Sequence, residues 1–123
     1  MYTIKIVNAS ANLTARDRIN LKDTNNAVSL DELTKAEEKP VLHITQWAEL
    51  NVSNDENGKE YNKYVLASAD GTKYTTGSAN FWKSFLSIAS ELAEEGEDEV
   101  DIVIYRLPSK NFPGKEFITC SLA

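Results

Sequence analysis

Cysteine, histidine and proline are scarce in this sequence, whose 123 residues include one Cys, one His and three Pro. The single Cys120 excludes an intramolecular disulfide, and with His43 as the only histidine, zinc sites built from several cysteines or histidines are excluded too. No stretch approaches the roughly 20 apolar residues of a membrane-spanning helix. The N-terminal residues 1–10 also lack the apolar segment of a signal peptide. We therefore expect a cytoplasmic protein that does not enter a membrane.

Sequence motifs of enzymes are absent as well. There is no Walker loop, no glycine-rich dinucleotide turn, no HExxH pair and no Gly-x-Ser-x-Gly elbow. No nucleophile or paired-carboxylate motif accompanies His43, which we expect to be a surface or stacking residue. Cys120 falls on the apolar face of its expected strand and should be a small buried hydrophobe. The sequence predicts a protein that is not an enzyme and has no cofactor or metal.

The charge is acidic overall but unevenly distributed. Nineteen Asp and Glu stand against 13 Lys and Arg, which gives a net charge of -6. Seven of these acids and no base lie between residues 91 and 101, so the rest of the chain carries 12 acids and 13 bases. Phosphate affinity comes from Lys and Arg, so an evenly acidic protein would be a poor nucleic-acid binder. Here the acidity is local. Such a run is usually a solvated helix end; the functional alternatives are repulsion of DNA and docking of a basic partner.

Residues 1–40 are expected to form an N-terminal extension. Polar residues dominate its middle part, while apolar and polar residues alternate near its start and again after Asp17. Ser29, with Glu32 three residues later, has the pattern of a capping box at the start of a helix. The expected elements are a strand over residues 3–7, a short strand over 18–22 and a short helix over 30–38.

Residues 41–123 contain the clearer signals. Asn57-Gly58 and Asp70-Gly71 are typical of tight hairpin turns, whereas Ser78 and Gly96 are suitable residues for the two ends of a helix. That helix carries an apolar stripe at helical spacing. The expected elements are strands over residues 41–50, 59–68, 72–76, 100–105 and 116–122, and a helix over 79–95.

The order of three strands, a helix and two strands is that of an OB-fold, a five-stranded Greek-key barrel that grips oligonucleotides with one sheet face and two loops. We therefore predict a mainly β chain with one principal helix. In this interpretation residues 41–123 form the OB-fold domain, and the N-terminal extension packs on or beside it.

Two segments resemble a known family. The residues Tyr74-Thr75-Thr76-Gly77-Ser78, continuing into Asn80-Phe81-Trp82-Lys83-Ser84-Phe85, are similar to the strand-to-helix junction of small OB-fold single-stranded-DNA-binding proteins. Phages and conjugative elements of Gram-positive bacteria encode these proteins. Residues 105–117, with sequence YRLPSKNFPGKEF, resemble their basic terminal hairpin. The resemblance covers about residues 40–123 and implies sequence-tolerant binding of single-stranded DNA during replication or transfer.

Such binding needs exposed aromatic rings on which bases stack and cations that follow the phosphates. Trp47 lies on the polar face of its expected strand, and Phe112 lies in a basic loop. Tyr61 and Tyr64 have opposite parity, so at most one of them faces outward. Each aromatic residue has the alternative of belonging to the core. The candidate binding residues are Trp47, Tyr61, Lys63, Tyr64, Lys73, Tyr105, Arg106, Lys110, Phe112 and Lys115, with Phe117 as a further outward aromatic residue.

The sequence thus predicts a single-stranded-DNA-binding protein that acts in phage or plasmid replication or transfer. Bound DNA should then quench the fluorescence of Trp47, and the N-terminal extension should mediate contacts between neighbouring subunits along the strand. The alternative is a protein-interaction module of a mobile element that acts through the acidic residues 91–101.

Overall fold

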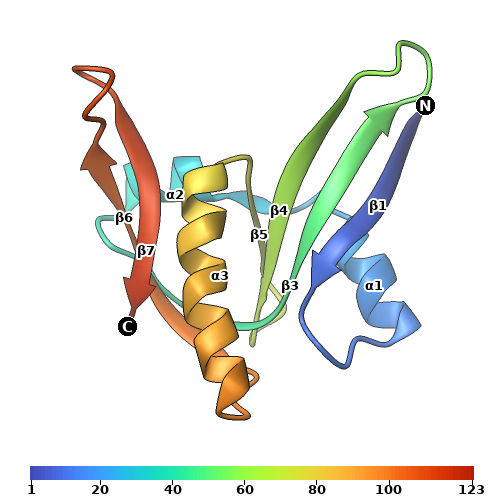
Figure 1. Cartoon of the computed structure of the whole chain (residues 1–123), viewed down its shortest axis with the longest axis horizontal. Helices are drawn as coiled ribbons and strands as arrows, with labels where there is room; N and C mark the ends of the chain where they lie inside the picture. Colours follow the sequence, from blue (N-terminus) through green and yellow to red (C-terminus); the bar gives the residue numbers. More distant parts are fainter.

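A computed structural model describes all 123 residues of the chain (Figure 1). None of its three helices is both long enough and apolar enough to cross a membrane. In chain order the elements are β1 (Tyr2–Ala9), α1 (Ala15–Lys22), β2 (Val28–Ser29), α2 (Leu30–Ala36), β3 (Val41–Asn54), β4 (Glu60–Ser68), β5 (Lys73–Thr76), α3 (Ala79–Glu94), β6 (Val100–Pro108) and β7 (Glu116–Leu122).

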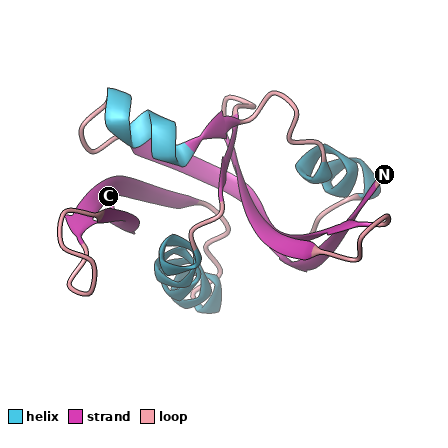
Figure 2. Ribbon diagram, turned by 90° about the horizontal axis from the view of Figure 1, so that it is seen from above, coloured by secondary structure: helices cyan, strands magenta, loops and turns pink.

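One sheet runs through the molecule, with strand order β2-β5-β4-β3-β6-β7. β1 pairs with the end of β3, along the edge that β6 leaves free. The sheet curls around α3 as a half-barrel and stays open, because β2 rather than β7 pairs with the outer edge of β5 (Figures 1 and 2). The prediction of a mainly β chain is confirmed.

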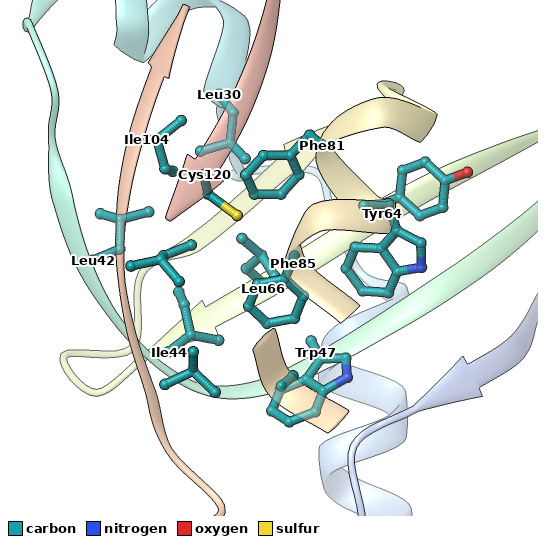
Figure 3. Packing of buried hydrophobic residues seen from close by; sticks show 14 of the residues in the cluster. Leu30, Leu42, Ile44, Trp47, Tyr64, Leu66, Phe81, Phe85, Ile104 and Cys120 are labelled. Atoms are coloured by element: carbon teal, nitrogen blue, oxygen red, sulfur yellow. The ribbon is translucent and has the colours of Figure 1, made fainter. Parts of the chain in front are cut away.

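Two hydrophobic cores lie on opposite faces of this sheet. The apolar stripe of α3 packs into the concave face, where Phe81 and Phe85 are fully buried (Figure 3). On the other face, α1 covers a smaller core with Leu21. The residues of this smaller core are Leu21, Ala48, Leu50, Val65 and Ala67.

A β-bulge at Thr45 makes β3 change faces. Ile44 and Gln46 lie opposite consecutive residues of β4, so Thr45 has no partner there. The extra residue shifts the alternation of side chains by one position. Ile44 before the bulge and Trp47 after it therefore both pack toward α3, while Leu50 turns toward α1. The prediction of a single apolar face with Trp47 on the polar side is wrong for this reason.

The N-terminal extension is part of the same sheet. The strand expected over residues 3–7 is confirmed as β1, and the helix expected after Ser29 is confirmed as α2. The short strand expected over residues 18–22 is wrong, because these residues belong to α1. A capping box starts this helix: the Asp17 amide donates to Oγ1 of Thr14 (3.1 Å), and the Thr14 amide donates to Oδ2 of Asp17 (2.9 Å).

The predicted limits of α3 are confirmed at both ends. Ser78 accepts a hydrogen bond from the amide of Phe81 through its side chain (3.2 Å). Gly96 has a φ of 79°, a left-handed conformation that glycine adopts without strain. The amide of Glu97 then donates back to the carbonyl of Leu92 (2.9 Å), as in a Schellman motif. This turn directs the acidic residues after α3 away from the core.

Candidate nucleic-acid interface

Two of the expected stacking residues lie in the core. Trp47 is 9% exposed and meets the ring of Phe85 edge-on, with ring centroids 5.3 Å apart. Tyr64, labelled in Figure 3, is 7% exposed. It stacks on Trp82, with ring centroids 4.8 Å apart. Neither ring offers a free face to a base. The placement of Trp47 and Tyr64 on a binding surface is therefore corrected to a packing role.

Tyr61 is the outward tyrosine of β4. It is 55% exposed and lies opposite Val52, near the turn that joins β3 to β4. Its separation from Tyr64 by three residues puts the two rings on opposite faces, which confirms that at most one of them faces outward. Tyr61 therefore remains available for stacking.

Lys63 and Lys73 are occupied by the chain around the end of α1. The ammonium of Lys63 donates to the hydroxyl of Thr24 (2.9 Å). That of Lys73 donates to the carbonyls of Asn20 (2.8 Å) and Asp23. A cation at a helix C-terminus satisfies carbonyls that have no partner in the helix. The segment that follows α1 thus takes the ammonium groups that were expected to contact phosphates.

Tyr105 and Arg106 also make contacts within the fold. The Tyr105 hydroxyl lies 2.6 Å from Oγ of Ser121 on the neighbouring strand. The guanidinium of Arg106 donates to Oγ1 of Thr34 (2.9 Å) and to the carbonyl of Asp31 (2.7 Å), which ties α2 to β6. Arg106 is half-buried there, and we assign it a structural rather than a DNA-contacting role.

The turn between β6 and β7 keeps the features that the sequence predicted. This tip loop (residues 109–115) is closed by a hydrogen bond from the amide of Ser109 to the carbonyl of Lys115 (2.8 Å). Phe112 is 62% exposed at its end, and Lys110 and Lys115 are exposed on either side of it. Beside the loop lies a hollow of about 600 Å³ whose lining includes Leu107, Phe117, Phe112, both lysines and Asn80 of α3.

Sequence reasoning missed two of the residues that line this hollow. Leu107 lies opposite Phe117 across the β6–β7 pair, and both side chains belong to the outward face. Alternation along the two strands was sufficient to predict that pairing. Asn80 approaches from the first turn of α3, and no local pattern in the sequence connects it with the tip loop.

The lysines of the tip loop form no ion pair and no side-chain hydrogen bond within the protein. In the whole structure no Lys or Arg side chain lies within salt-bridge distance of a carboxylate; the ion pairs are those of the N-terminal amine and of His43. Neither Lys110 nor Lys115 donates a side-chain hydrogen bond, unlike Lys63, Lys73 and Arg106. A phosphate reaching the loop would therefore not have to displace an internal partner from these two ammonium groups.

The acidic run lies at the other end of α3. All seven of its carboxylates are exposed, as expected of a solvated helix end. His43 lies between two of them, with Nε2 at 2.7 Å from Glu99 and Nδ1 against Asp101. The hydrogen bonds to Glu99 and then to Asp101 raise the pKa of His43 above its usual value of 6.5. Burial raises the pKa of the Cys120 thiol to about 12, so Cys120 is the inert buried residue that the sequence predicted.

The raised pKa of His43 makes stability depend on pH. Because the folded state binds this proton more tightly, its stabilising contribution is complete below about pH 6.5 and is lost as the pH rises through the folded-state pKa. We expect the difference in melting temperature between the natural protein and a His43→Gln variant to be larger at pH 6 than at pH 9. As the only histidine, His43 can also be titrated by NMR without ambiguity; a pKa at or below 6.5 would contradict the two contacts.

Comparison with protein-family models, curated proteins and solved structures gives no match for this chain. No set of three or more His, Cys, Asp or Glu side chains in the structure is arranged to hold a metal ion.

Proposed function

We propose that the protein binds single-stranded DNA without sequence preference, through the tip loop and the hairpins beside α3. The observation that carries this proposal is Phe112, an exposed ring between two lysines that have no partner in the protein. Stacking on an aromatic ring contributes about 1–3 kcal/mol per base and tolerates every base, because each base has a π-face. Lys110 and Lys115 would hold the adjacent phosphates.

The arrangement of the hairpins supports the proposal. The β3–β4 and β6–β7 turns point in the same direction on either side of α3 (Figure 1). We infer that residues 41–123 are an opened OB-fold, in which the corresponding two loops grip the oligonucleotide. Phe112 on the second hairpin would then stack one base, and Tyr61, beside the turn of the first hairpin, would stack another on the sheet face opposite α3. Action in phage or plasmid replication remains part of this proposal.

Distance along α3 reduces the repulsion of DNA by the acidic run. Asn80 in the first turn lines the hollow of the tip loop, whereas the acids begin at Glu91, in the last turn of this 16-residue helix. At 1.5 Å per residue the separation between Asn80 and Glu91 is roughly 17 Å, about twice the Debye length of roughly 8 Å at physiological ionic strength. The charge that a phosphate meets at the tip loop is therefore set mainly by the lining of the hollow, with Lys110 and Lys115 against Glu116.

A titration of fluorescently labelled oligo-dT tests the proposal. An oligonucleotide of about 20 nucleotides exceeds the roughly 4–16 that one OB-fold covers. We expect its anisotropy to rise at micromolar protein in low salt. Two phosphate contacts predict a slope of about −1.4 for log K against log salt concentration, at roughly −0.7 per contact. No anisotropy change at any salt concentration would overturn the proposal.

Intrinsic fluorescence is not the right readout for this titration. Trp47 and Trp82 are both buried, so the quenching expected from an outward Trp47 should not occur. Strong quenching of the natural tryptophans on addition of oligo-dT would show that bases reach the core face, and would contradict the proposed path along the tip loop.

A further inference from the structure

A second surface on the protein has the opposite charge. Between the C-terminal half of α3, residues 45–47 of β3 and the end of β1 with the loop after it lies a groove of about 420 Å³, which we call the α3–β3 groove. Apolar side chains of α3 and β3 form one part of its lining, which we call the floor, beside polar side chains of β1, β3, α3 and the loop after β1. Two acids of the turn after α3 form its rim. The residues used below are Trp47, Leu86, Ala89 and Ala93 in the floor, and Glu97 and Asp98 in the rim.

We propose that the α3–β3 groove binds a Lys- or Arg-bearing segment of a partner protein. No Lys or Arg lines the groove, and neither Glu97 nor Asp98 forms an ion pair within the protein. The apolar floor would accept an apolar side chain or the methylene stem of a basic one, while the charged end reaches the rim. DNA is excluded from the same surface, because phosphates and carboxylates repel each other.

The cost of these acids to the helix favours a binding role. Negative charges near a helix C-terminus oppose the helix dipole and are destabilising. α3 has no basic residue in its last turn to offset them, whereas its N-terminal end is capped as expected. Unfavourable charges thus lie at the end of α3 beside the groove, whereas the other end has a favourable cap. Such a departure from good local helix design is typical of a functional surface.

The α3–β3 groove is separate from the tip loop and large enough to hold a ligand. The two sites lie at opposite ends of α3 (Figure 1), so a basic protein segment and a DNA strand can be bound together. The volume of the α3–β3 groove, about 420 Å³, lies within the roughly 300–1,000 Å³ typical of ligand-binding pockets. A short peptide with alternating basic and apolar residues is therefore the chemistry that the groove fits.

Binding of a fluorescein-labelled peptide of repeated Lys-Leu-Ala units, about 12 residues long, tests the proposal in moderate salt. We expect Glu97→Lys combined with Asp98→Lys to weaken binding at least about tenfold, because like charges then meet at the rim. The matched control is Glu91→Lys with Glu94→Lys, which makes the same change of charge on α3 outside the groove lining. This control should weaken binding less than about threefold.

A variant that fills the groove without altering charge separates shape from electrostatics. Ala93→Trp should weaken peptide binding about tenfold and leave the affinity for oligo-dT unchanged. Ser90→Trp, at another exposed position of the lining, serves if the first variant does not fold. Equal losses in the two charge variants, or no loss in the folded tryptophan variant, would overturn the proposal. So would concentration-dependent self-association in sedimentation that Ala93→Trp abolishes, because the occupant would then be a second copy of the chain.

Discussion

Replacing Trp47 with alanine should lower the free energy of unfolding by about 3–5 kcal/mol, the range for removing a large aromatic side chain from a core. The ring of Trp47 is 9% exposed and packs edge-on against Phe85, which is itself fully buried. Neighbouring strands cannot collapse into the space, because β3 is hydrogen-bonded on both sides. Urea unfolding followed by circular dichroism measures the change.

Trp47→Phe is the matched control for this experiment. It keeps an aromatic ring in the same place and should lose only part of the stability. In both variants the affinity of the folded fraction for oligo-dT should equal that of the natural protein. If Trp47→Ala kept its stability and lost DNA binding, the ring would be a binding platform and its burial against Phe85 would be wrong.

Replacing Phe112 with alanine should weaken binding of oligo-dT about 5- to 150-fold, which corresponds to the loss of about 1–3 kcal/mol of stacking. Stability should change little, because the ring is 62% exposed and belongs to neither core. Leu122→Ala is the matched control: this side chain is 57% exposed on β7, at the strand end far from the tip loop. The anisotropy titration gives both affinities.

Replacing the lysines of the tip loop should change the salt dependence of DNA binding. Lys110→Gln and Lys115→Gln should each make the salt dependence shallower by roughly 0.7 in slope, as expected when one phosphate contact is removed from a single strand. Lys73→Gln should leave the slope unchanged, because its ammonium is held by the end of α1. An effect of Lys73→Gln equal to that of the tip-loop variants would place the DNA on the face covered by α1 instead.

The elements with strong local signals were predictable. α3 has an apolar stripe, a serine cap and a terminal glycine, and each of these acts within a few residues along the chain. β7 follows from alternation alone. The tip loop was predictable for a similar reason, because Phe112 lies among proline, glycine and lysine residues with no apolar neighbour in sequence to pack against.

The face of Trp47 could not be predicted, because it depends on one unpaired residue in the middle of a strand. Leu42, Ile44 and Leu50 have the same parity, and a regular strand would place all of them on one face. The bulge at Thr45 sends Leu50 to the second core. That second core exists because α1 packs on the outer face, and α1 has little amphipathic signal apart from its capping box.

The roles of Lys63, Lys73 and Arg106 depend on contacts between segments far apart in the chain. Each donates to oxygen atoms about 39 to 75 residues earlier in sequence, in the two segments that precede β3. Residue type and local charge do not distinguish a lysine that donates to backbone carbonyls from one that is available to bind a phosphate. The extension over residues 1–40 was predicted to pack on or beside the rest of the chain; its hydrogen bonds to these cations were not.

A ¹H–¹⁵N correlation spectrum recorded during titration with oligo-dT locates the bound strand residue by residue. If DNA binds at the tip loop, shifted amides should concentrate in residues 107–117 and around Tyr61, with residues 91–101 unaffected. Shifts that centre on the acidic run, or that leave the tip loop unmoved while DNA binds, would contradict this location.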